Sequence, residues 1–559
     1  MPTLDWIGKK AVVNHHREVP YRLIHCDGEL SAGNPDAGNL LVQGDNLEAL
    51  KALLPYYAGK VKCIYIDPPY NTGNEGWVYN DNVNSAEMKA WLGKVVGKET
   101  EDLSRHDKWL CMMYPRLRLL RDFLRDDGMI FISIDANELA GLVFLMDEIF
   151  GPKNRKTIIA NVNNPKGRSD DKYFATAHES LVVYGMEKCV VGGFEPEHHI
   201  TKRYNKFDGN GLKYREIDLR KTGDNDRKVD RPNMFYPFYY DERTAEIRLH
   251  QKSSSDVAIY PMKSKAEEGR WRWSADTASN KLAQLSARYM PNKEQWSVFE
   301  LDYLEGRSLV TPTTAWTGKQ HNSERGSELL RELGFAKEDF DRPKPIGTII
   351  DILTIATNQD DLILDSFAGS GTTGHAVLSV NSADGGNRRF ILIEMDKPIA
   401  AKVTAERLKR AINGYDKLGD PKTRVEGLHS GFRFCSLGAP LFNDLGDIDV
   451  EVTFPDLAAH IFFSETGVPI PHRANENSSF IGTYKEKAVY LLFSAAEQGI
   501  AREAAGNVLT PDVLAQLPPV PEGFTGQRVV YGEGCTVSAD RLKVEGVTFK
   551  QIPYQIEAN

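Results

Sequence analysis

The sequence predicts an α/β fold with a mixed, mostly parallel sheet, an inserted region and a further α/β domain at the carboxyl end. Short apolar runs such as Val61 to Ile66 have the length and composition of buried parallel strands. Helix-like segments separate these runs, as βαβ units require. At 559 residues the chain is too long for one core. The alternating pattern fades between residues 201 and 335, where we expect the insertion.

The expected domain boundaries follow these changes in pattern. Polar residues broken by Pro and Gly predict an arm with little regular structure at residues 1–38. The main α/β domain is expected in two halves, 39–200 and 336–425, on either side of the insertion at 201–335. Residues 426–559 contain apolar or β-prone runs separated by turns, enough for a small folded domain. These runs are Val450 to Phe454, Ala488 to Phe493 and Val529 to Tyr531.

The composition is that of an ordinary globular protein, with 41% hydrophobic and 26% charged residues. No apolar run is long enough to span a membrane, and the first residues lack an apolar signal segment. We therefore expect a cytoplasmic protein with no membrane partner. The six cysteines show no CxxC or CxxH spacing, which predicts reduced thiols and no metal site.

The net charge of −9 is unevenly distributed. Residues 201–330 contain 23 Lys and Arg against 19 Asp and Glu, a balance of +4. Residues 431–559 contain 9 Lys and Arg against 16 Asp and Glu, a balance of −7. The middle of the chain can therefore face a polyanion, whereas the carboxyl-terminal part would be repelled by one.

The first half of the α/β domain alternates strands and helices. Asn39 to Asp45 predicts a strand that ends in an acid, and Asn46 to Gly59 predicts a helix with leucines on one face. Val61 to Ile66 is the next strand, and a Gly- and Asn-rich loop is expected from there to about Arg105. The remaining elements are a helix at 107–126, a strand at 128–135, a helix at 136–150, and strands at 157–162 and 180–184.

The strand Val61 to Ile66 ends at Asp67-Pro68-Pro69-Tyr70. Two consecutive prolines cannot donate to a sheet, so the strand stops and the backbone becomes extended. These residues therefore lie at the carboxyl end of a buried strand, the edge at which open α/β sheets bind ligands. A carboxylate, the Pro68 carbonyl and a flat ring suit a planar molecule that carries an exocyclic amino group.

The second half of the domain opens at Lys344-Pro345 and continues with a helix at 346–356 and a strand at 361–367. A glycine-rich loop, residues 368–374, follows this strand. Glycines let the backbone turn sharply and approach a ligand, and the next helix presents free N–H groups to that ligand.

A further strand, Arg389 to Glu394, ends in an acid 20 residues beyond Gly374. Gly369-x-Gly371-x-x-Gly374 with this acid also matches the dinucleotide-binding fingerprint. A nicotinamide-dependent enzyme needs no Asp-Pro-Pro-Tyr on another strand, however, which disfavours that alternative.

Asp67-Pro68-Pro69-Tyr70 followed by Asn-Thr-Gly resembles the catalytic motif of β-class amino DNA methyltransferases, in particular the modification (Mod) subunits of type III restriction systems. DSFAGSGTTG, residues 365–374, resembles the S-adenosylmethionine loop of that family. The catalytic motif comes first, which is the circularly permuted order of the β class. The resemblance covers about residues 39–415 and implies a Rossmann-like S-adenosylmethionine-dependent methyltransferase fold whose insertion is the target recognition domain.

The resemblance implies that Asp67 and the Pro68 carbonyl hold a target amine and that Tyr70 stacks on a flipped base, with Pro69 completing the catalytic motif. His178-Glu179 matches a weaker family motif that lines the base pocket. Asp45 is either a cofactor residue or a helix cap. The residues implied in binding S-adenosylmethionine are Asp45, Lys344, Asp365, Phe367, Gly369, Ser370, Gly371, Thr372 and Glu394.

In the insertion, cationic and aromatic residues alternate, as DNA-reading surfaces require. The candidate DNA-binding residues are Tyr214, Arg215, Arg270, Trp271, Arg272 and Trp273.

The function that the resemblance implies is methyl transfer to the 6-amino group of adenine in duplex DNA, within a restriction-modification or phage-defence system. The alternatives are a cytosine 4-amino DNA methyltransferase and a catalytically silent DNA-specificity subunit. The expected partners are double-stranded DNA, a second copy of the chain and a restriction or helicase subunit, with residues 426–559 mediating association.

Overall fold

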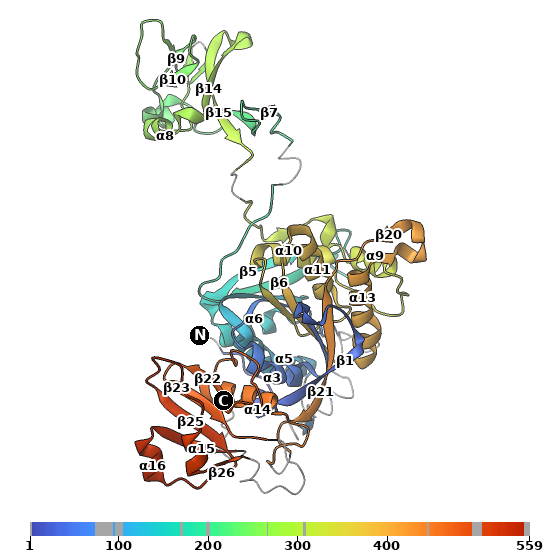
Figure 1. The fold of residues 1–559 in the computed structure, drawn as a ribbon. Coiled ribbons are helices and arrows are strands. Elements are labelled where there is room, and N and C mark those ends of the chain that lie inside the picture. The colour runs from blue at the N-terminus through green and yellow to red at the C-terminus, as the bar shows by residue number, and fades with distance from the viewer. Residues whose placement is uncertain are drawn as a thin grey trace. The chain divides into compact units, whose positions relative to one another are not determined.

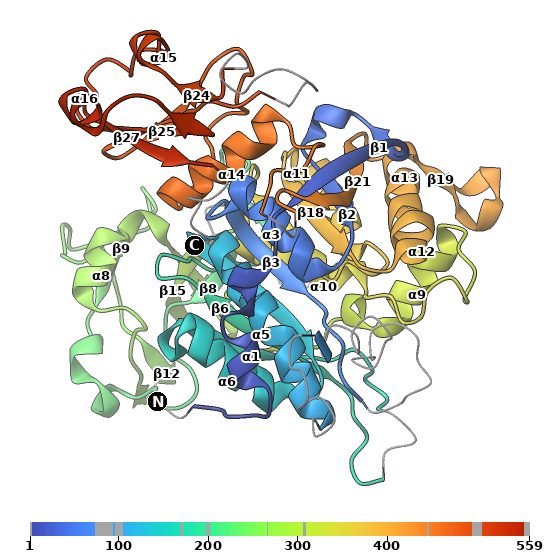
Figure 2. The same cartoon turned by 90° about the horizontal axis from the view of Figure 1, so that it is seen from below.

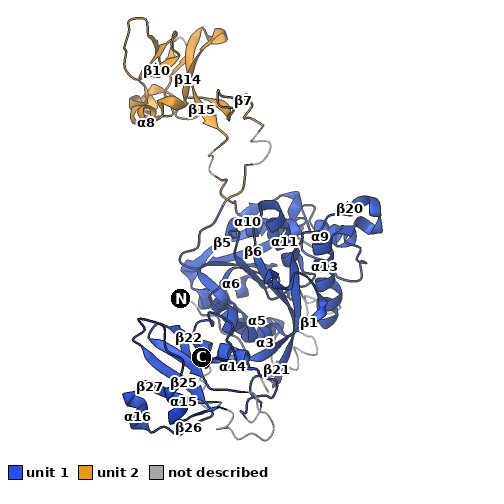
Figure 3. Cartoon of the chain, in the orientation of Figure 1, with its two compact units in different colours: residues 1–192, 312–559 blue, residues 193–311 orange. Residues whose placement is uncertain are grey.

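The computed structural model of the chain describes residues 3–72, 93–94, 104–167, 172–196, 202–264, 266–305, 309–443, 446–494 and 506–552. The chain forms two compact units, which Figure 3 shows in different colours. One unit joins Met1–Gly192 to Pro312–Asn559, and the other is Gly193–Thr311. The predicted insertion at 201–335 overlaps the second unit, but its last part, from Pro312 onward, belongs to the first.

Within the described residues, a ten-stranded sheet forms the centre of the larger unit (Figures 1 and 2). Six neighbouring strand pairs are parallel and three are antiparallel, which confirms the predicted mixed, mostly parallel sheet. In spatial order the strands are β1 (Arg22–Gly33), β21 (Gly431–Pro440), β2 (Leu40–Gln43), β18 (Arg389–Glu394), β17 (Leu362–Asp365), β3 (Val61–Ile66), β4 (Leu124–Ile134), β6 (Glu179–Gly185), β5 (Arg155–Asn161) and β16 (Ala315–Trp316).

The pairing of β3 with β17 joins the two halves of the α/β domain. Cys63 lies opposite Ile363, and Ile64 lies opposite Leu364, in a parallel register. Both strands are buried along their whole length. Because parallel strands end at the same edge, this pairing brings the residues after Ile66 next to those after Asp365.

Helices cover both faces of the sheet. Leu364 and Ile391 share one apolar cluster with helices α3 (Asn46–Tyr57), α5 (Arg105–Phe123) and α6 (Leu139–Phe150). On the other face, a Cβ added at Gly374 would meet Phe390, Leu392 and Leu408, so α11 packs closely there. The helices on this side are α10 (Ile346–Ala356), α11 (Thr372–Asp384) and α13 (Ala405–Asn413), seen apart from α3 and α5 in Figure 1.

The amino-terminal segment differs from the predicted arm. It contains α1 (Lys9–Val12), α2 (His15–Glu18) and β1, which pairs with β21. Trp6 and Val12 are buried in the main apolar cluster, and Trp6 Nε1 donates to Cys111 Sγ at 3.3 Å. Strand β1 is an edge strand with mostly exposed side chains, so its polar composition concealed it.

The expectation of six reduced thiols is also wrong. Cys26 on β1 lies opposite Cys435 on β21, and the two form a disulfide. A separation of 409 residues gives no spacing signal in the sequence.

The carboxyl-terminal part forms a smaller layer on the larger unit. Helix α14 (Phe454–Thr466) packs against α3 on one side and a four-stranded sheet on the other. Val450 to Phe454 was expected to be a β-prone run, but Val450 is 92% exposed and Phe454 begins α14 behind a Thr453–Asp456 capping box. The other elements are β22 (Phe480–Tyr484), β23 (Lys487–Leu491), β25 (Gln527–Gly532), β27 (Val547–Gln551), α15 (Pro511–Ala515) and α16 (Ala539–Val544).

The smaller unit is built mainly of antiparallel strands around its own core. Trp271, Phe238 and Val298 are among its buried residues. Phe194 and Val310 bridge its two ends through hydrogen bonds of 2.9 and 2.8 Å. Its main strands are β7 (Lys206–Phe207), β8 (Lys213–Asp218), β9 (Phe238–Asp241), β10 (Glu246–Arg248), β11 (Val257–Ile259), β14 (Leu285–Met290) and β15 (Gln295–Tyr303), with helix α8 (Ala275–Asn280).

The loop predicted between Tyr70 and Arg105 lies outside the described residues at 73–92 and 95–103, and Gly73 of the catalytic motif lies there too. Across the described part of the chain, no helix combines the length and the apolar character that a membrane span requires.

Candidate active site

A cluster of buried charges lies at the carboxyl end of β3. Lys344 Nζ is 3.2 Å from Asp67 Oδ1 and 2.7 Å from Glu179 Oε2. Tyr70 OH donates to Glu179 Oε2 at 2.9 Å and accepts from Lys344 Nζ. Lys344 Nζ also lies 4.8 Å from the centroid of the Tyr70 ring. One ammonium group therefore holds two carboxylates and one aromatic ring together.

The pKa values of the two carboxylates in this cluster shift in opposite directions. Burial raises the pKa of Asp67 above its usual value, although Lys344 partly opposes the change. Burial also acts to raise the pKa of Glu179, but Lys344 and hydrogen bonds from Tyr70 and Asn161 outweigh it and the pKa falls. Burial acts to lower the pKa of Lys344, but Asp67 and Glu179 raise it. Burial thus dominates at Asp67, whereas the charge of Lys344 and the hydrogen bonds dominate at Glu179.

Two acceptors of the catalytic motif are available to a ligand. Trp109 Nε1 donates to the Pro69 carbonyl at 2.7 Å, which anchors the turn on α5. In the described part of the chain, the neighbouring Pro68 carbonyl accepts no hydrogen bond, whereas Asp67 Oδ1 lies 3.2 Å from Lys344 Nζ and has a second lone pair. A group with two N–H donors could satisfy both oxygens.

Asn71 closes the turn in a strained conformation. Its φ of 55° lies in the left-handed region, which side chains seldom adopt. Its Nδ2 donates to Glu138 Oε1 at 2.5 Å and to the Arg105 carbonyl at 3.1 Å. Glu138 is 2% exposed and also contacts His106 Nδ1 at 2.7 Å. These bonds hold the turn after Tyr70 in place.

The glycine-rich loop after β17 forms the second wall of the candidate site, next to the first wall, which is the turn Asp67–Asn71 after β3. Gly369 and Gly371 have φ angles of 50° and 76°, and a Cβ at Gly371 would lie 3.0 Å from Thr404 Cγ2. Glu394 Oε2 accepts from Gly369 N at 2.8 Å, which ties the end of β18 to the loop. The loop thus combines an open backbone with a carboxylate at its edge, as a ligand with hydroxyl groups would require.

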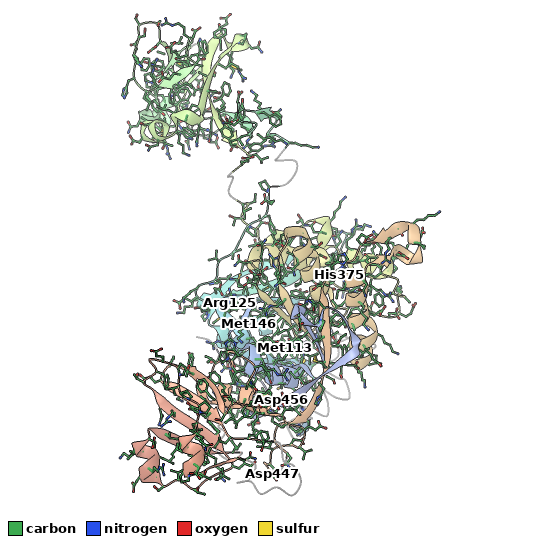
Figure 4. The ribbon with its side chains drawn as sticks, viewed as in Figure 1. Met113, Arg125, Met146, His375, Asp447 and Asp456 are labelled. Atoms are coloured by element: carbon green, nitrogen blue, oxygen red, sulfur yellow. A yellow bond between two sulfur atoms is a disulfide. The ribbon has the colours of Figure 1, made fainter. Side chains whose placement is uncertain are left out.

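A buried arginine supports this loop from below. Arg407 is fully buried, and its Nη1 donates to Ser370 Oγ at 2.9 Å and to Thr372 Oγ1 at 2.8 Å. Its Nε lies 3.4 Å from Nδ1 of His375, a residue of α11 that is labelled in Figure 4. The hydroxyls of Ser370 and Thr372 therefore face Arg407. The carbonyls of Gly369 and Ser370 also have partners, Thr404 Oγ1 at 2.6 Å and Arg407 Nη1 at 3.4 Å.

Asp365 and Asp45 make contacts of a structural kind. Asp365 is 2% exposed, and its oxygens accept from Phe367 N at 3.0 Å and Thr373 Oγ1 at 2.5 Å. Asp45 caps α3 through Leu47 N and Glu48 N and pairs with Arg116. Asp45 is therefore the N-cap of α3, which was one of the two alternatives for this residue. Asp365 holds the glycine-rich loop through its hydrogen bonds to Phe367 and Thr373.

Several residues near Asp67 were not predicted as site residues. Asn161, Trp109 and Glu138 are buried polar partners whose roles depend on tertiary contacts, so no local pattern indicated them. Glu179 was flagged only by a weak motif, and its neighbour His178 is exposed.

In the smaller unit, the candidate DNA-binding residues need correction. Trp271 is 1% exposed and belongs to the core, and Arg270 is buried with its Nε donating to the Asn225 carbonyl at 2.5 Å. Neither can reach a duplex in this structure. Arg272 pairs with Glu300, which reduces its free charge.

The other three candidates are partly exposed but already have partners. Arg215 Nε lies 2.7 Å from Asp302 Oδ2. Tyr214 packs against Tyr303, and Lys281 lies over the ring of Trp273. The exposed aromatic side chains that sequence reasoning missed are Phe207, Tyr260 and Tyr289.

Among the described residues, no group of His, Cys, Asp and Glu side chains has the arrangement of a metal site. The candidate site is therefore described by its carboxylates, its lysine and its loop.

Comparisons with known proteins agree with this arrangement. The family described as DNA methylase (N6_N4_Mtase) matches residues 61–405. The type III restriction-modification enzyme EcoPI Mod subunit of Escherichia phage P1 is 34% identical over 418 residues, covering 71% of this chain and 64% of the relative.

The type II methyltransferase M.KpnI of Klebsiella pneumoniae is 35% identical over 379 residues, covering 67% of this chain and 84% of the relative. Among solved structures, the M1.HpyAVI–SAM complex aligns with a TM-score of 0.29 and 14% identity, over 66% of this chain and 98% of that one.

Asp365→Asn is expected to make the protein relatively more stable as the pH rises. Burial raises the pKa of Asp365 from 3.8 to about 7, so the folded protein keeps a proton that the unfolded chain has lost. The resulting stability is complete below about pH 4 and disappears as the pH rises through 7. Asparagine has no charge to bury. The melting temperature of the variant, relative to the parent protein, should increase between pH 5 and 8; a constant difference would contradict this role.

Proposed function

This chain belongs to the DNA methylase family, and from that premise we propose that it transfers a methyl group from S-adenosylmethionine to the 6-amino group of adenine in duplex DNA. The observation that carries the proposal is the position of Asp67-Pro68-Pro69-Tyr70 beside the glycine-rich loop, on adjacent strands β3 and β17. Methyl transfer needs the methyl donor and the amine to lie next to each other. At this sheet edge the glycine-rich loop can bind the donor, and Asp67-Pro68-Pro69-Tyr70 can bind the amine.

Asp67 and Pro68 are the proposed acceptors for the target amine. The lone pair of the 6-amino group is delocalised into the adenine ring, so the amine is a weak nucleophile. If Asp67 Oδ1 and the Pro68 carbonyl each accept one N–H, the nitrogen becomes pyramidal and its lone pair points toward the methyl group. The carboxylate also stabilises the positive charge that develops on nitrogen.

Tyr70 is proposed to stack on the flipped base. Extruding a base from a duplex costs a few kcal/mol, and stacking on an aromatic ring returns about 1–3 kcal/mol. Glu179 and Lys344 hold the hydroxyl of Tyr70, so the ring is already fixed in place. Binding of the base therefore does not have to offset the entropy of ordering this side chain. This preorganisation supports Glu179 as a residue that positions Tyr70.

The residues of the second wall fit S-adenosylmethionine, which supplies the methyl group when bound. Glu394 keeps lone pairs that can accept from ribose hydroxyls while it holds Gly369 N. Phe367 is half-buried at the loop and can pack against a flat base. The loop itself, Gly369 to Thr372, presents backbone groups rather than side chains. Lys344 lies between the two walls and can contact either ligand.

The smaller unit is proposed as the target recognition domain. Its exposed rings Phe207, Tyr260 and Tyr289 and its excess of cations support contact with bases and phosphates. The carboxyl-terminal residues 426–559 are proposed to mediate association, either with a second copy or with a restriction subunit, because the −7 balance of residues 431–559 disfavours DNA. Light scattering of the purified chain would test the homodimer; a monomer at all concentrations would exclude it.

The purified chain, incubated with duplex DNA and S-adenosylmethionine, should produce 6-methyladenine in nucleoside mass analysis. Asp67→Ala should reduce the rate by about 100-fold or more because it removes an acceptor that stabilises the transition state. The affinity for the cofactor should stay within about twofold, since the loop and Glu394 carry it. Product confined to 4-methylcytosine would overturn the base assignment, and loss of cofactor binding in Asp67→Ala would overturn the assigned roles.

Lys344→Met should move the acid limb of the pH–rate profile to higher pH. Lys344 holds down the pKa of both Asp67 and Glu179, so without its charge each carboxyl takes up a proton at higher pH. A protonated Asp67 no longer offers two acceptor oxygens. Lys344→Arg keeps the charge and should leave the limb near its original place. An unchanged limb in Lys344→Met would exclude this electrostatic role.

Exchanging residues 195–309 for the matching segment of a relative should change the methylated sequence. Phe194 and Val310, which bridge the ends of the unit, lie outside the exchanged segment and stay in place. Sequencing of modified bases in a host that expresses each protein provides the measurement. A folded, active hybrid that still methylates the original site would place recognition elsewhere.

A further inference from the structure

A cavity of about 700 Å³ lies at the opposite edge of the sheet from Asp67. Its lining includes Leu40, at the amino end of β2, and Lys60, directly before β3. Helix α14 and residues 470–474 form the other wall. Figure 4 labels Asp456, a lining residue on α14 where the carboxyl-terminal part meets α3. The cavity has the size of small-ligand pockets in other proteins.

Cations gather at this cavity without matching acids. Lys60, Arg433 and Arg473 line it, and Asp456 is the carboxylate among its lining residues. Over the residues that the structure describes, none of these three cations makes an ion pair or a side-chain hydrogen bond. By contrast, Arg22, which also lines the cavity, pairs with Glu48 at 3.0 Å.

Lys60 also lies close enough to Arg389, a cation outside the cavity lining, for the two charges to repel one another. Burial lowers the pKa of Lys60, and the nearby charge of Arg389, the first residue of β18, lowers it further. Arg433 and Arg389 both act on the hydroxyl of Tyr57. Like charges in a partly buried place are unfavourable unless an anion neutralises them. This end of the cavity therefore suits a phosphate group.

The rest of the cavity suits a flat, polar group. Tyr21, Tyr56 and Tyr57 contribute rings to the lining. His460 also lines it, is 3% exposed, and has an Nδ1 with no hydrogen-bond partner in the described part of the chain. Burial lowers the pKa of His460 to about 3, so its ring is neutral and can donate or accept. The side chain of His460 therefore adds a neutral ring to this part of the lining.

We propose that this cavity binds a nucleotide, with its phosphates on Lys60 and Arg433 and its base among the tyrosine rings near His460. The volume exceeds what inorganic phosphate alone would fill, and rings beside cations are the features that a nucleotide needs. The site is separate from the cofactor loop, which lies at the carboxyl edge of the sheet.

The proposal is tested by calorimetric titration of the full chain with ADP. The cofactor loop could itself accept an adenine nucleotide, so the protein is first saturated with S-adenosylhomocysteine. ADP should bind at one site, and adenosine, which lacks the phosphates, should bind about tenfold more weakly or worse. Inorganic phosphate should compete with ADP. Equal binding of adenosine and ADP would overturn the proposed phosphate contacts.

Two variants locate the site. Arg433→Gln and Lys60→Gln should each weaken ADP binding about tenfold or more, because each removes a charge-assisted hydrogen bond. Arg541→Gln, an exposed arginine of α16, serves as the matched control and should bind ADP as the parent does. Methyl transfer by all three should be unchanged. No detectable binding of ADP to the parent protein, or equal binding by the parent, Arg433→Gln and Lys60→Gln, would overturn the proposal.

Discussion

The ion pairs of Lys344 are the interaction on which the candidate site depends. Asp67 and Glu179 are both buried, and two buried carboxylates a few ångströms apart cannot both stay ionised without a cation. Lys344 supplies that cation from a segment 277 residues further along the chain. Its removal would leave two uncompensated charges, a change that typically destabilises a protein by about 3–5 kcal/mol. The same contact that permits the chemistry therefore also holds the two halves of the domain together.

Much of the central fold could be predicted from the sequence because its strands are short, fully buried apolar runs. Val61 to Ile66 and Arg389 to Glu394 coincide with β3 and β18 as observed. The turns at the ends of these strands could be predicted because proline restricts the backbone and glycine frees it, whatever their tertiary neighbours are. Each motif was predicted to follow a strand, and the parallel register of β3 with β17 places both at one edge of the sheet.

The errors arose where a residue's role depends on its tertiary neighbours. Strand β1 is polar because it is an edge strand, so its composition suggested a loop. Trp271 and Arg270 belong to an alternating run of cationic and aromatic residues that suggested a DNA-binding surface. In the structure both side chains are buried, and Trp271 is part of the core of the smaller unit. In each case the competing partner lies far away or on a face that the sequence does not specify.

The position of the insertion explains how chemistry and recognition can be separated in one chain. Strand β6 ends at Gly185, before the smaller unit begins, and β16 returns to the same sheet at Ala315 to pair with β5. The two ends of the smaller unit are bridged at Phe194 and Val310, so its strands can change without moving either neighbour. Asp67, Glu179, Lys344 and Glu394 all lie outside it. The sequence of this unit can therefore change while the charge cluster around Lys344 stays the same.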